Sequence, residues 1–286
     1  MPSLLGNAAE AVCHFWYGTD MKARVIIEKK IGETPLEALS AWKVANPIYA
    51  NIPASYAGRL DPIASGKLLI LLGDECKKQD RYTGLDKEYE VEVLLDCGSD
   101  TGDVLGLPLY VGKETHPATR EVASVLSSVS GTHPLPYPAF SSKTVNGKPL
   151  FLHSLEGTID TIEIPVHDET IYRIKLLERI EVSKDSLLAR IDALVSSAPR
   201  SDEPSKVLGA DFRQDTIRAQ WTDLFASMPT RTFTILRLRA TCASGTYMRT
   251  LAERIGKELG TNGLALSIHR TKIGRFGPLG FWKTFR

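Results

Sequence analysis

A run of five large apolar residues, Leu68 to Leu72 in "GKLLILLG", most constrains how this chain can fold. Glycines stand on either side of the run, at positions 66 and 73. A continuous apolar stretch of this length between glycines is typical of a buried strand rather than of a strand with one face in water. The chain can supply the core that such a strand needs, since 43% of its 286 residues are hydrophobic.

The rest of the sequence mixes strand and helix patterns without a regular βαβ series, which predicts an α+β (mixed α/β) fold with many hairpins. Further strands are expected at 23–30, 87–96 and in "IYRIKLLERIEV" and "TFTILRLRATCASG". Helices are expected at 34–45, 118–131 and 244–260. The segment 132–150 contains four prolines and an Asn-Gly pair, which predicts a loop followed by a hairpin turn.

Two segments stand apart from this pattern. Residues 1–22 resemble a loose extension, without the basic start and apolar stretch of a secretory signal. Residues 183–230 contain two helical patterns separated by the Pro/Ser/charge-rich linker "SSAPRSDEPSK". We expect the second segment to be an insertion.

The distribution of charge and the cysteine content indicate which ligands and which cellular compartment fit this chain. Residues 231–286 hold eleven Lys and Arg but two acids, although the whole chain has a net charge of +1. A basic segment of this kind attracts a polyanion to one face or is simply a solvated surface. The four cysteines are scattered, without metal-site spacing, which disfavours zinc and disulfides and favours a reducing, cytoplasmic location. The sequence has no transmembrane run, so we expect no membrane partner.

One carboxylate, Asp61 in "SYAGRLDPIASG", has an unusual setting. Locally, Asp-Pro is a helix-start signal, with Asp61 as N-cap and Pro62 in the first turn. However, Gly58 and Gly66 permit positive φ or close backbone approach, and the buried strand follows directly. A carboxylate that rigid backbone holds in place in this way can serve as an acid, a base or a nucleophile.

A second group of acids, Asp96, Asp100 and Asp103 in "LDCGSDTGDVLG", does not have calcium-loop spacing. An EF-hand loop has acids at alternate positions and a glutamate at position twelve. Here the intervals are four and three. These three aspartates are therefore interpreted as turn residues after a strand, and no metal site is expected.

Five successive stretches resemble the ordered motifs of the TruB-type pseudouridine synthases. They are "YAGRLDPIASGKLLILLG", "LDKEYEVEVLLDCGSDTGDVLG", "YPAFSSKTVNGKPL", "CASGTYMRTLAERIGKELG" and "LSIHRTKIGRF". The resemblance implies a central, mostly antiparallel sheet with flanking helices in a catalytic domain at 23–286. It also implies a thumb-like hairpin segment at about 107–155. The chain ends ten residues after Phe276, so we expect no C-terminal PUA domain of the kind that many family members carry.

The family resemblance implies that uridine 55 in the T-loop of tRNA is isomerised to pseudouridine, without a cofactor. Asp61 matches the family's essential aspartate, and Arg249 matches the arginine that pairs with it. An adjacent cation would favour the ionised carboxylate. Tyr89 matches the tyrosine that stacks on the target base, and Tyr247 and Ile268 match positions that line the uracil pocket. The sequence leaves open whether the carboxylate attacks the sugar, offsets its charge or removes a proton.

Two positions depart from the family pattern, where a histidine and a threonine normally stand. Tyr56 and Arg59 occupy these places, and we hypothesise that one of them fills the space left by the flipped base.

Two alternatives therefore stay open: the same reaction on ribosomal or messenger RNA, and a non-catalytic RNA-binding or RNA-folding module. A monomer is expected. Phosphate contacts are expected from six basic residues: Lys30, Lys143, Lys148, Arg270, Lys272 and Arg275.

Overall fold

The computed structural model describes residues 22–110, 114–199, 213–277 and 279–284. The expected N-terminal extension therefore lies outside the described residues except for Lys22. Among the described residues, no helix combines the length and the apolar character needed to cross a membrane.

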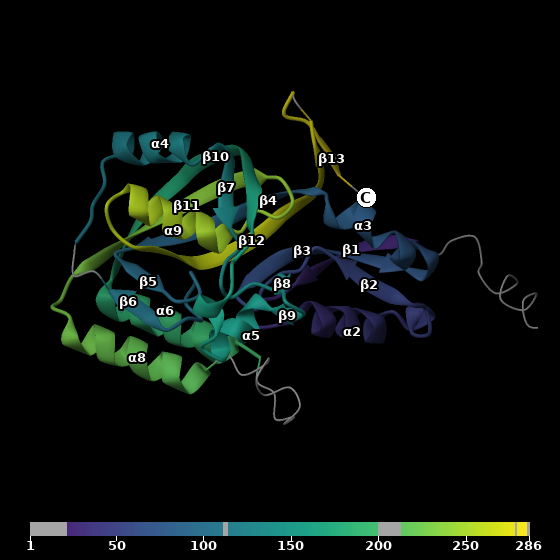
Figure 1. Cartoon of the computed structure of the whole chain (residues 1–286), viewed down its shortest axis with the longest axis horizontal. Coiled ribbons are helices and arrows are strands. Elements are labelled where there is room, and N and C mark those ends of the chain that lie inside the picture. Colours follow the sequence, from purple (N-terminus) through teal and green to yellow (C-terminus); the bar gives the residue numbers. More distant parts are fainter. Residues whose placement is uncertain (1–21, 111–113, 200–212, 278, 285–286) are drawn as a thin grey trace, which may run out of the picture.

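A large mixed sheet forms the centre of the molecule (Figure 1). Seven strands follow one another in space in the order β1 (Arg24–Lys29), β3 (Ala64–Leu72), β12 (Gly263–Phe276), β4 (Asp86–Leu95), β11 (Thr232–Cys242), β10 (Val166–Ser183) and β7 (Gly131–Pro136). Two short strands extend it, since β2 (Ala54–Ala57) pairs with β3 and β13 (Trp282–Thr284) pairs with β12. Within this sheet, β3 and β12 pair in parallel and the other neighbours are antiparallel. The expected mixed fold with a mostly antiparallel sheet is confirmed.

Two small hairpins and a set of helices surround the sheet. The hairpins are β5 (Cys97–Ser99) with β6 (Pro108–Tyr110), and β8 (Thr144–Val145) with β9 (Lys148–Pro149). The α-helices are α2 (Pro35–Ala45), α3 (Gln79–Thr83), α4 (Thr119–Ser128), α5 (Leu150–Leu155), α6 (Lys184–Ser197), α8 (Gln214–Ser227) and α9 (Met248–Glu258). The short 3-10 helices are η1 (Pro47–Tyr49), η2 (Gly73–Lys78) and η3 (Ile159–Thr161). In the view of Figure 1, α4 lies above the sheet, α9 lies across β11 and β12, and α6 and α8 lie below the sheet.

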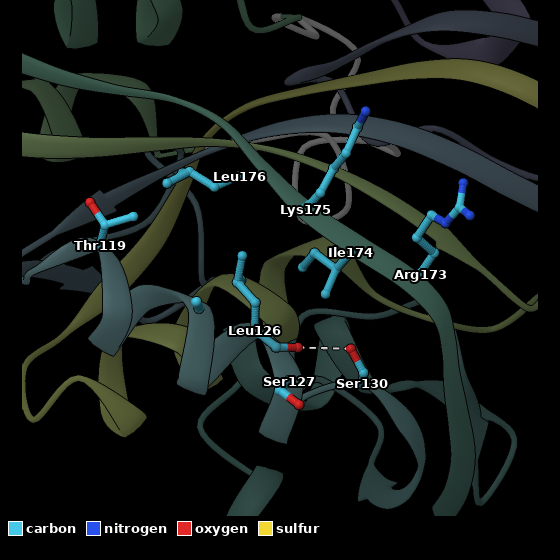
Figure 2. A pocket seen from close by; sticks show the side chains of 9 residues that line it. Thr119, Leu126, Ser127, Ser130, Arg173, Ile174, Lys175 and Leu176 are labelled. Carbon is cyan, nitrogen blue, oxygen red and sulfur yellow. Dashed lines mark hydrogen bonds between the residues drawn. The ribbon is translucent and has the colours of Figure 1, made fainter.

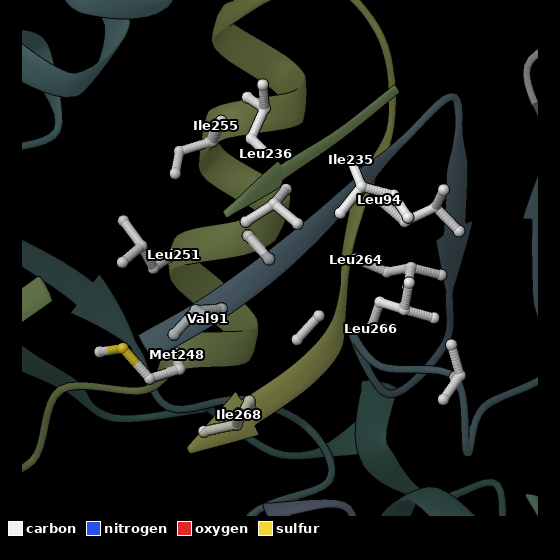
Figure 3. Packing of buried hydrophobic residues seen from close by; sticks show 14 of the residues in the cluster. Val91, Leu94, Ile235, Leu236, Met248, Leu251, Ile255, Leu264, Leu266 and Ile268 are labelled. Carbon is white, nitrogen blue, oxygen red and sulfur yellow. The ribbon is translucent and has the colours of Figure 1, made fainter. Parts of the chain in front are cut away.

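The apolar run Leu68–Leu72 forms the end of the inner strand β3, where Leu68 to Leu71 are completely buried. The main core lies between α9 and strands β4, β11 and β12 (Figure 3). Leu251 and Ile255 of α9 point into it at the four-residue spacing that the sequence shows. Gly260, at φ +72°, follows the end of that helix as expected. The core thus anchors α9, which carries one of the candidate site residues near its start.

Three local predictions are wrong. No helix begins at Asp61, because residues 61–63 form a turn and β3 starts at Ala64. The predicted loop after position 131 begins instead with the strand β7, which tolerates prolines because it lies at the edge of the sheet. Helix α9 begins at Met248, four residues after the predicted start.

Other local predictions are confirmed. Asn146 and Gly147, at φ +51° and +79°, form the turn between β8 and β9, as the Asn-Gly pair predicts. Both helices predicted within 183–230 are present as α6 and α8, which pack against each other. The linker predicted between them falls mainly on residues 200–212, outside the described residues.

Candidate active site

Asp61 lies in the tight connection between β2 and β3. Its carbonyl accepts a hydrogen bond from the amide of Ala64 at 2.9 Å, which closes a turn directly before β3. The side chain is 46% exposed. The turn therefore fixes the carboxylate in place and still leaves part of it open to a ligand.

Arg270 of β12 holds this connection from the other side. It is fully buried, and its guanidinium donates to the carbonyls of Lys67 (2.6 Å), Gly58 (3.0 Å) and Arg59 (3.4 Å). Gly66 lets β12 approach so closely, because at φ +104° an added Cβ would lie 2.4 Å from the Arg270 carbonyl oxygen. The prediction that Arg270 contacts phosphate is wrong, since a buried guanidinium bound to three carbonyls cannot reach a phosphate.

Arg249, in the first turn of α9, supplies the partner of Asp61. Its Nε lies 3.0 Å from Oδ2 of Asp61, and its side chain is 6% exposed. Nη1 donates to the carbonyl of Thr101 at 2.7 Å, and Nη2 donates to the carbonyl of Phe140 at 3.0 Å. Three separate segments of the chain therefore fix the guanidinium that faces Asp61, and the expected pairing is observed.

Asp103 is a second carboxylate beside the same guanidinium. Its Oδ2 lies 3.7 Å from Nε of Arg249, and its Oδ1 accepts hydrogen bonds from Oγ1 of Thr101 and the amide of Leu105. Burial raises the pKa of Asp103 to about 6, against the opposing effect of Arg249. For Arg249, the negative charges of Asp61 and Asp103 outweigh burial, so its pKa stands above the ordinary value. The prediction that Asp103 is a turn residue is correct. Its contact with Arg249 was not predicted, because an aspartate at this place in the sequence needs no explanation beyond the turn.

Lys29, at the end of β1, is a further charged residue close to the turn that contains Asp61. It is fully buried and donates from Nζ to the carbonyls of Ala64 (2.6 Å) and Lys30 (2.9 Å). Burial lowers the pKa of Lys29 to about 8, although nearby carboxylates, including Asp61, partly counteract this shift. The alternation of β1 could have revealed this residue, since Ile27 and Lys29 point to the same buried side.

Two of the predicted pocket residues lie on adjacent sheet strands. Tyr89 of β4 is almost fully buried, and its pKa is raised chiefly by burial, with a further contribution from the negative charge of Asp61. Ile268 of β12 faces Val91 of β4 on one side and Ala64 of β3 on the other. Both residues belong to the main core, so each also has a packing role.

Tyr247 directly precedes α9 and is only partly buried. Its pKa is raised chiefly by burial and also by the charge of Asp61. Its ring meets those of Tyr137 and His167 edge-on, with centroids 6.2 and 5.9 Å away. Of these residues Arg249 contacts the Asp61 carboxylate directly, whereas Asp61 acts on Tyr89 and Tyr247 through its charge, which contributes to their raised pKa values.

Tyr56 and Arg59 line a neighbouring hollow of about 440 Å³. Tyr56 is partly buried and packs against the cluster beneath α2, whereas the side chain of Arg59 is exposed. Other residues around this hollow come from α2, β2, α3 and the connection after β2 (Leu36, Leu39, Ala54, Ser55, Gly58, Gln79 and Thr83). The hollow adjoins the Asp61 connection through Gly58 and Arg59.

Five of the six expected phosphate contacts reach the surface. Lys30 and Arg275 are exposed, and Lys143 lies 5.0 Å from the centre of the Tyr137 ring. Lys148 pairs with Glu156, and Lys272 lies 3.0 Å from Glu88. These five cations remain candidate RNA contacts.

A second hollow, of about 430 Å³, lies between α4 and β10 (Figure 2). Leu126, Ile174 and Leu176 lie around it, together with polar residues of α4 and the basic residues Arg173 and Lys175. None of the predicted site residues lines this hollow. Within the described part of the chain, no cluster of His, Cys, Asp and Glu could hold a metal ion.

The sheet and the site together define a mixed α/β protein with an open carboxylate, a buried guanidinium partner and an aromatic lining. The fold resembles that of one chain in a crystal structure of a Cbf5–Nop10–Gar1 complex, with a TM-score of 0.51 and 16% sequence identity. The similarity covers 88% of this chain and 48% of that chain.

Residues 48–196 match the family described as TruB family pseudouridylate synthase (N terminal domain). The chain belongs to this family. The matched segment contains Asp61, Tyr89 and α6, and it ends before α8.

Curated relatives share a common name. A tRNA pseudouridine synthase B of Nitrosococcus oceani is 28% identical over 264 residues, which cover 91% of this chain and 66% of the relative. A tRNA pseudouridine synthase B of Bifidobacterium longum is 29% identical over 257 residues, which cover 88% of this chain and 63% of the relative. The chain thus spans just under two thirds of the length of these relatives.

Proposed function

We propose that this protein isomerises uridine to pseudouridine in RNA, and that its target is uridine 55 in the T-loop of tRNA. The observation that carries the proposal is the 3.0 Å contact between Asp61 and Arg249, two residues far apart in the sequence. Family membership and the name of the curated relatives support the reaction and tRNA as the substrate.

The reaction is an isomerisation whose atoms balance within the nucleotide. The bond between N1 of uracil and the sugar carbon breaks, the base turns, and C5 bonds to the same carbon. C5 then loses its proton and N1 gains one. Cleavage of a glycosidic bond builds positive, oxocarbenium-like charge on the sugar, so the site must supply a negative charge there and exclude competing water.

Asp61 supplies that negative charge. It either attacks the sugar carbon, offsets its positive charge or removes a sugar proton, and each route requires an ionised carboxylate with an open oxygen. Arg249 orients the carboxylate, because its guanidinium is itself fixed by the carbonyls of Thr101 and Phe140. Asp103 is a second negative charge beside the same nitrogen, Nε of Arg249.

The target base must leave its stack to reach this carboxylate, which costs a few kcal/mol. Tyr89 and Tyr247 offer aromatic rings beside Asp61, and Ile268 offers an apolar wall. Stacking of a base on an aromatic ring contributes about 1–3 kcal/mol. Tyr56 or Arg59 is proposed to occupy the place that the flipped base vacates.

The proposed partner is a tRNA stem-loop bound by a protein monomer in the cytoplasm. Exposed cations such as Lys30 and Arg275 would neutralise phosphates along the stem. The segment around Phe140 and the β8–β9 hairpin would close over the loop as the thumb.

The test is to incubate purified full-length protein with unmodified tRNA transcripts and to map pseudouridine at single-base resolution. We expect modification at T-loop uridine 55, and none with the Asp61→Asn variant. Modification only in ribosomal or messenger RNA would show that the substrate is one of these RNAs and not tRNA. A protein that binds RNA but modifies none of these substrates would refute the enzymatic proposal.

A further inference from the structure

Arg213, directly before α8, contacts two distant segments of the chain. Its Nη1 lies 2.7 Å from Oδ2 of Asp100, and its Nη2 lies 3.3 Å from Oδ1 of the same carboxylate. The guanidinium carbon also lies 4.9 Å from the centre of the Phe140 ring. One side chain therefore connects the turn after β5 with the segment after β7.

Both contacted segments hold Arg249. Phe140 provides the carbonyl that accepts from Nη2 of Arg249, and Thr101, the neighbour of Asp100, provides the carbonyl that accepts from Nη1. The Asp100 turn is itself stiff, because Asp100 accepts from the amide of Leu107 at 2.7 Å and donates its own amide to the Leu107 carbonyl. Arg213 is thus one contact away from each of the two carbonyls that place the Arg249 guanidinium.

We propose that Arg213 is a positioning residue, which fixes Arg249 and through it the Asp61 carboxylate. This inference rests on the proposed function, since its effect is on the rate of that reaction. A catalytic group must be held within about 0.5 Å of its productive place. Residues that orient a site from one step away typically change activity by about 10–100-fold when they are removed.

The chemistry of the contact explains why an arginine stands here. A guanidinium is planar, binds a carboxylate with two parallel N–H groups and stacks on an aromatic face at the same time. A lysine could replace the charge but could not make both contacts in one plane. The backbone of Arg213 has φ +52°, a left-handed conformation that is uncommon for a residue with a side chain and that often marks a functional site.

The test compares Arg213→Ala and Arg213→Lys with the matched control Arg218→Ala. Arg218 lies on the same helix, but it pairs with Asp192 of α6 and touches no part of the site. Single-turnover rates, tRNA dissociation constants and melting temperatures are measured for each protein. We expect Arg213→Ala to slow turnover about 10–100-fold while tRNA affinity changes less than about threefold. Arg213→Lys should recover only part of the rate, and Arg218→Ala should keep the wild-type rate.

A double-mutant cycle with Arg249→Lys separates positioning from general stability. If Arg213 acts through Arg249, its removal has a much smaller effect once Arg249 is replaced. The inference is overturned if Arg213→Ala reacts at the wild-type rate, or if its effect is unchanged in the Arg249→Lys background. A wild-type protein that forms no pseudouridine would instead overturn the proposed function, and the inference with it.

Discussion

Two of the aspartate–arginine pairs among the described residues differ in how much of each carboxylate is left open. In the first pair, Asp96 follows β4 and contacts Arg231 at 2.5 Å, with side-chain exposures of 0% and 4%. Asp96 also accepts hydrogen bonds from Oγ1 of Thr261 and from the amide of Thr115. In the second pair, Arg249 is equally buried, but Asp61 is 46% exposed.

The difference separates a structural pair from the pair that we propose to be reactive. The Asp96 carboxylate is completely buried and already accepts from Thr115, Arg231 and Thr261, so a ligand cannot reach it. The Asp61 carboxylate meets its guanidinium through one oxygen, and the rest of it faces outward. The buried Arg249 guanidinium holds the Asp61 carboxylate in place, and the exposed part of that carboxylate can still contact a substrate.

The largest expected effect comes from Asp61→Asn, which keeps the shape of the side chain and removes its charge. We expect the single-turnover rate to fall by about 10³-fold or more, because no other carboxylate can take its place at the sugar. The melting temperature should change little, since the side chain is half exposed. The rate is measured by release of label from C5 of the uracil ring. Retention of full activity would contradict the assignment of Asp61.

The structural pair should show the opposite pattern. Asp96→Asn tolerates the left-handed backbone at φ +71°, so it removes mainly the charge. Removing the negative charge that faces the buried Arg231 guanidinium should cost about 3–5 kcal/mol of unfolding free energy. Urea denaturation measures this loss, and the turnover rate of the remaining folded protein, assayed at low temperature, should stay within a few-fold of wild type. An inactive but stable variant would show that the two pairs do not differ as described.

Glu169 of β10 differs from both aspartates, because it is buried and no guanidinium among the described residues forms an ion pair with it. Its Oε2 accepts from the Tyr247 amide at 3.3 Å, its Oε1 has no hydrogen-bond partner, and Nε2 of His167 lies 3.5 Å away. Burial raises the pKa of Glu169 from 4.5 to about 7, although the charge of Arg254 opposes this rise. The folded protein therefore binds more protons than the unfolded chain between these two pH values.

Stability should fall as the pH rises through this window, since the folded state must then hold a buried negative charge. A shift of this size corresponds to a loss of about 3 kcal/mol by neutral pH. Glu169→Gln should remove this part of the slope of unfolding free energy against pH, whereas Asp168→Asn, at an exposed neighbour, should not. Equal slopes for wild type and Glu169→Gln would contradict the prediction.

Patterns along the chain predicted the inner strand and the helices well, because their signals are local. The run at Leu68–Leu72 is continuous, and the apolar spacing of α9 repeats every four residues. The helix start at Asp61 was wrong for the same reason. The Asp-Pro signal is local, but the pairing of β3 with β1 and β12 decides the backbone there.

The site needed information from distant parts of the chain. No spacing rule connects Asp61 with Arg249, and their pairing was expected only from the family resemblance. Arg270 was interpreted as a surface cation because of its charge. Its position two residues after Ile268 on β12 places both on the same buried side, so strand alternation could have identified it. The carbonyls of Thr101 and Phe140 have no sequence signature, since every residue carries one.

The smallest expected effects come from Tyr56 and Arg59, which line the hollow next to the connection that carries Asp61. If Tyr56 stacks in the space left by the flipped base, Tyr56→Ala should weaken tRNA binding about tenfold, the cost of one lost stack. Arg59→Ala should weaken it about two- to threefold, because Arg59 is exposed and a single screened charge contributes little.

Filter binding at two salt concentrations distinguishes the two contacts, since the loss of a phosphate contact lowers the salt dependence and the loss of a stack does not. Arg81→Ala, an exposed arginine on the neighbouring helix α3, controls for charge alone. If neither Tyr56→Ala nor Arg59→Ala weakens binding or slows turnover, neither residue fills the vacated space.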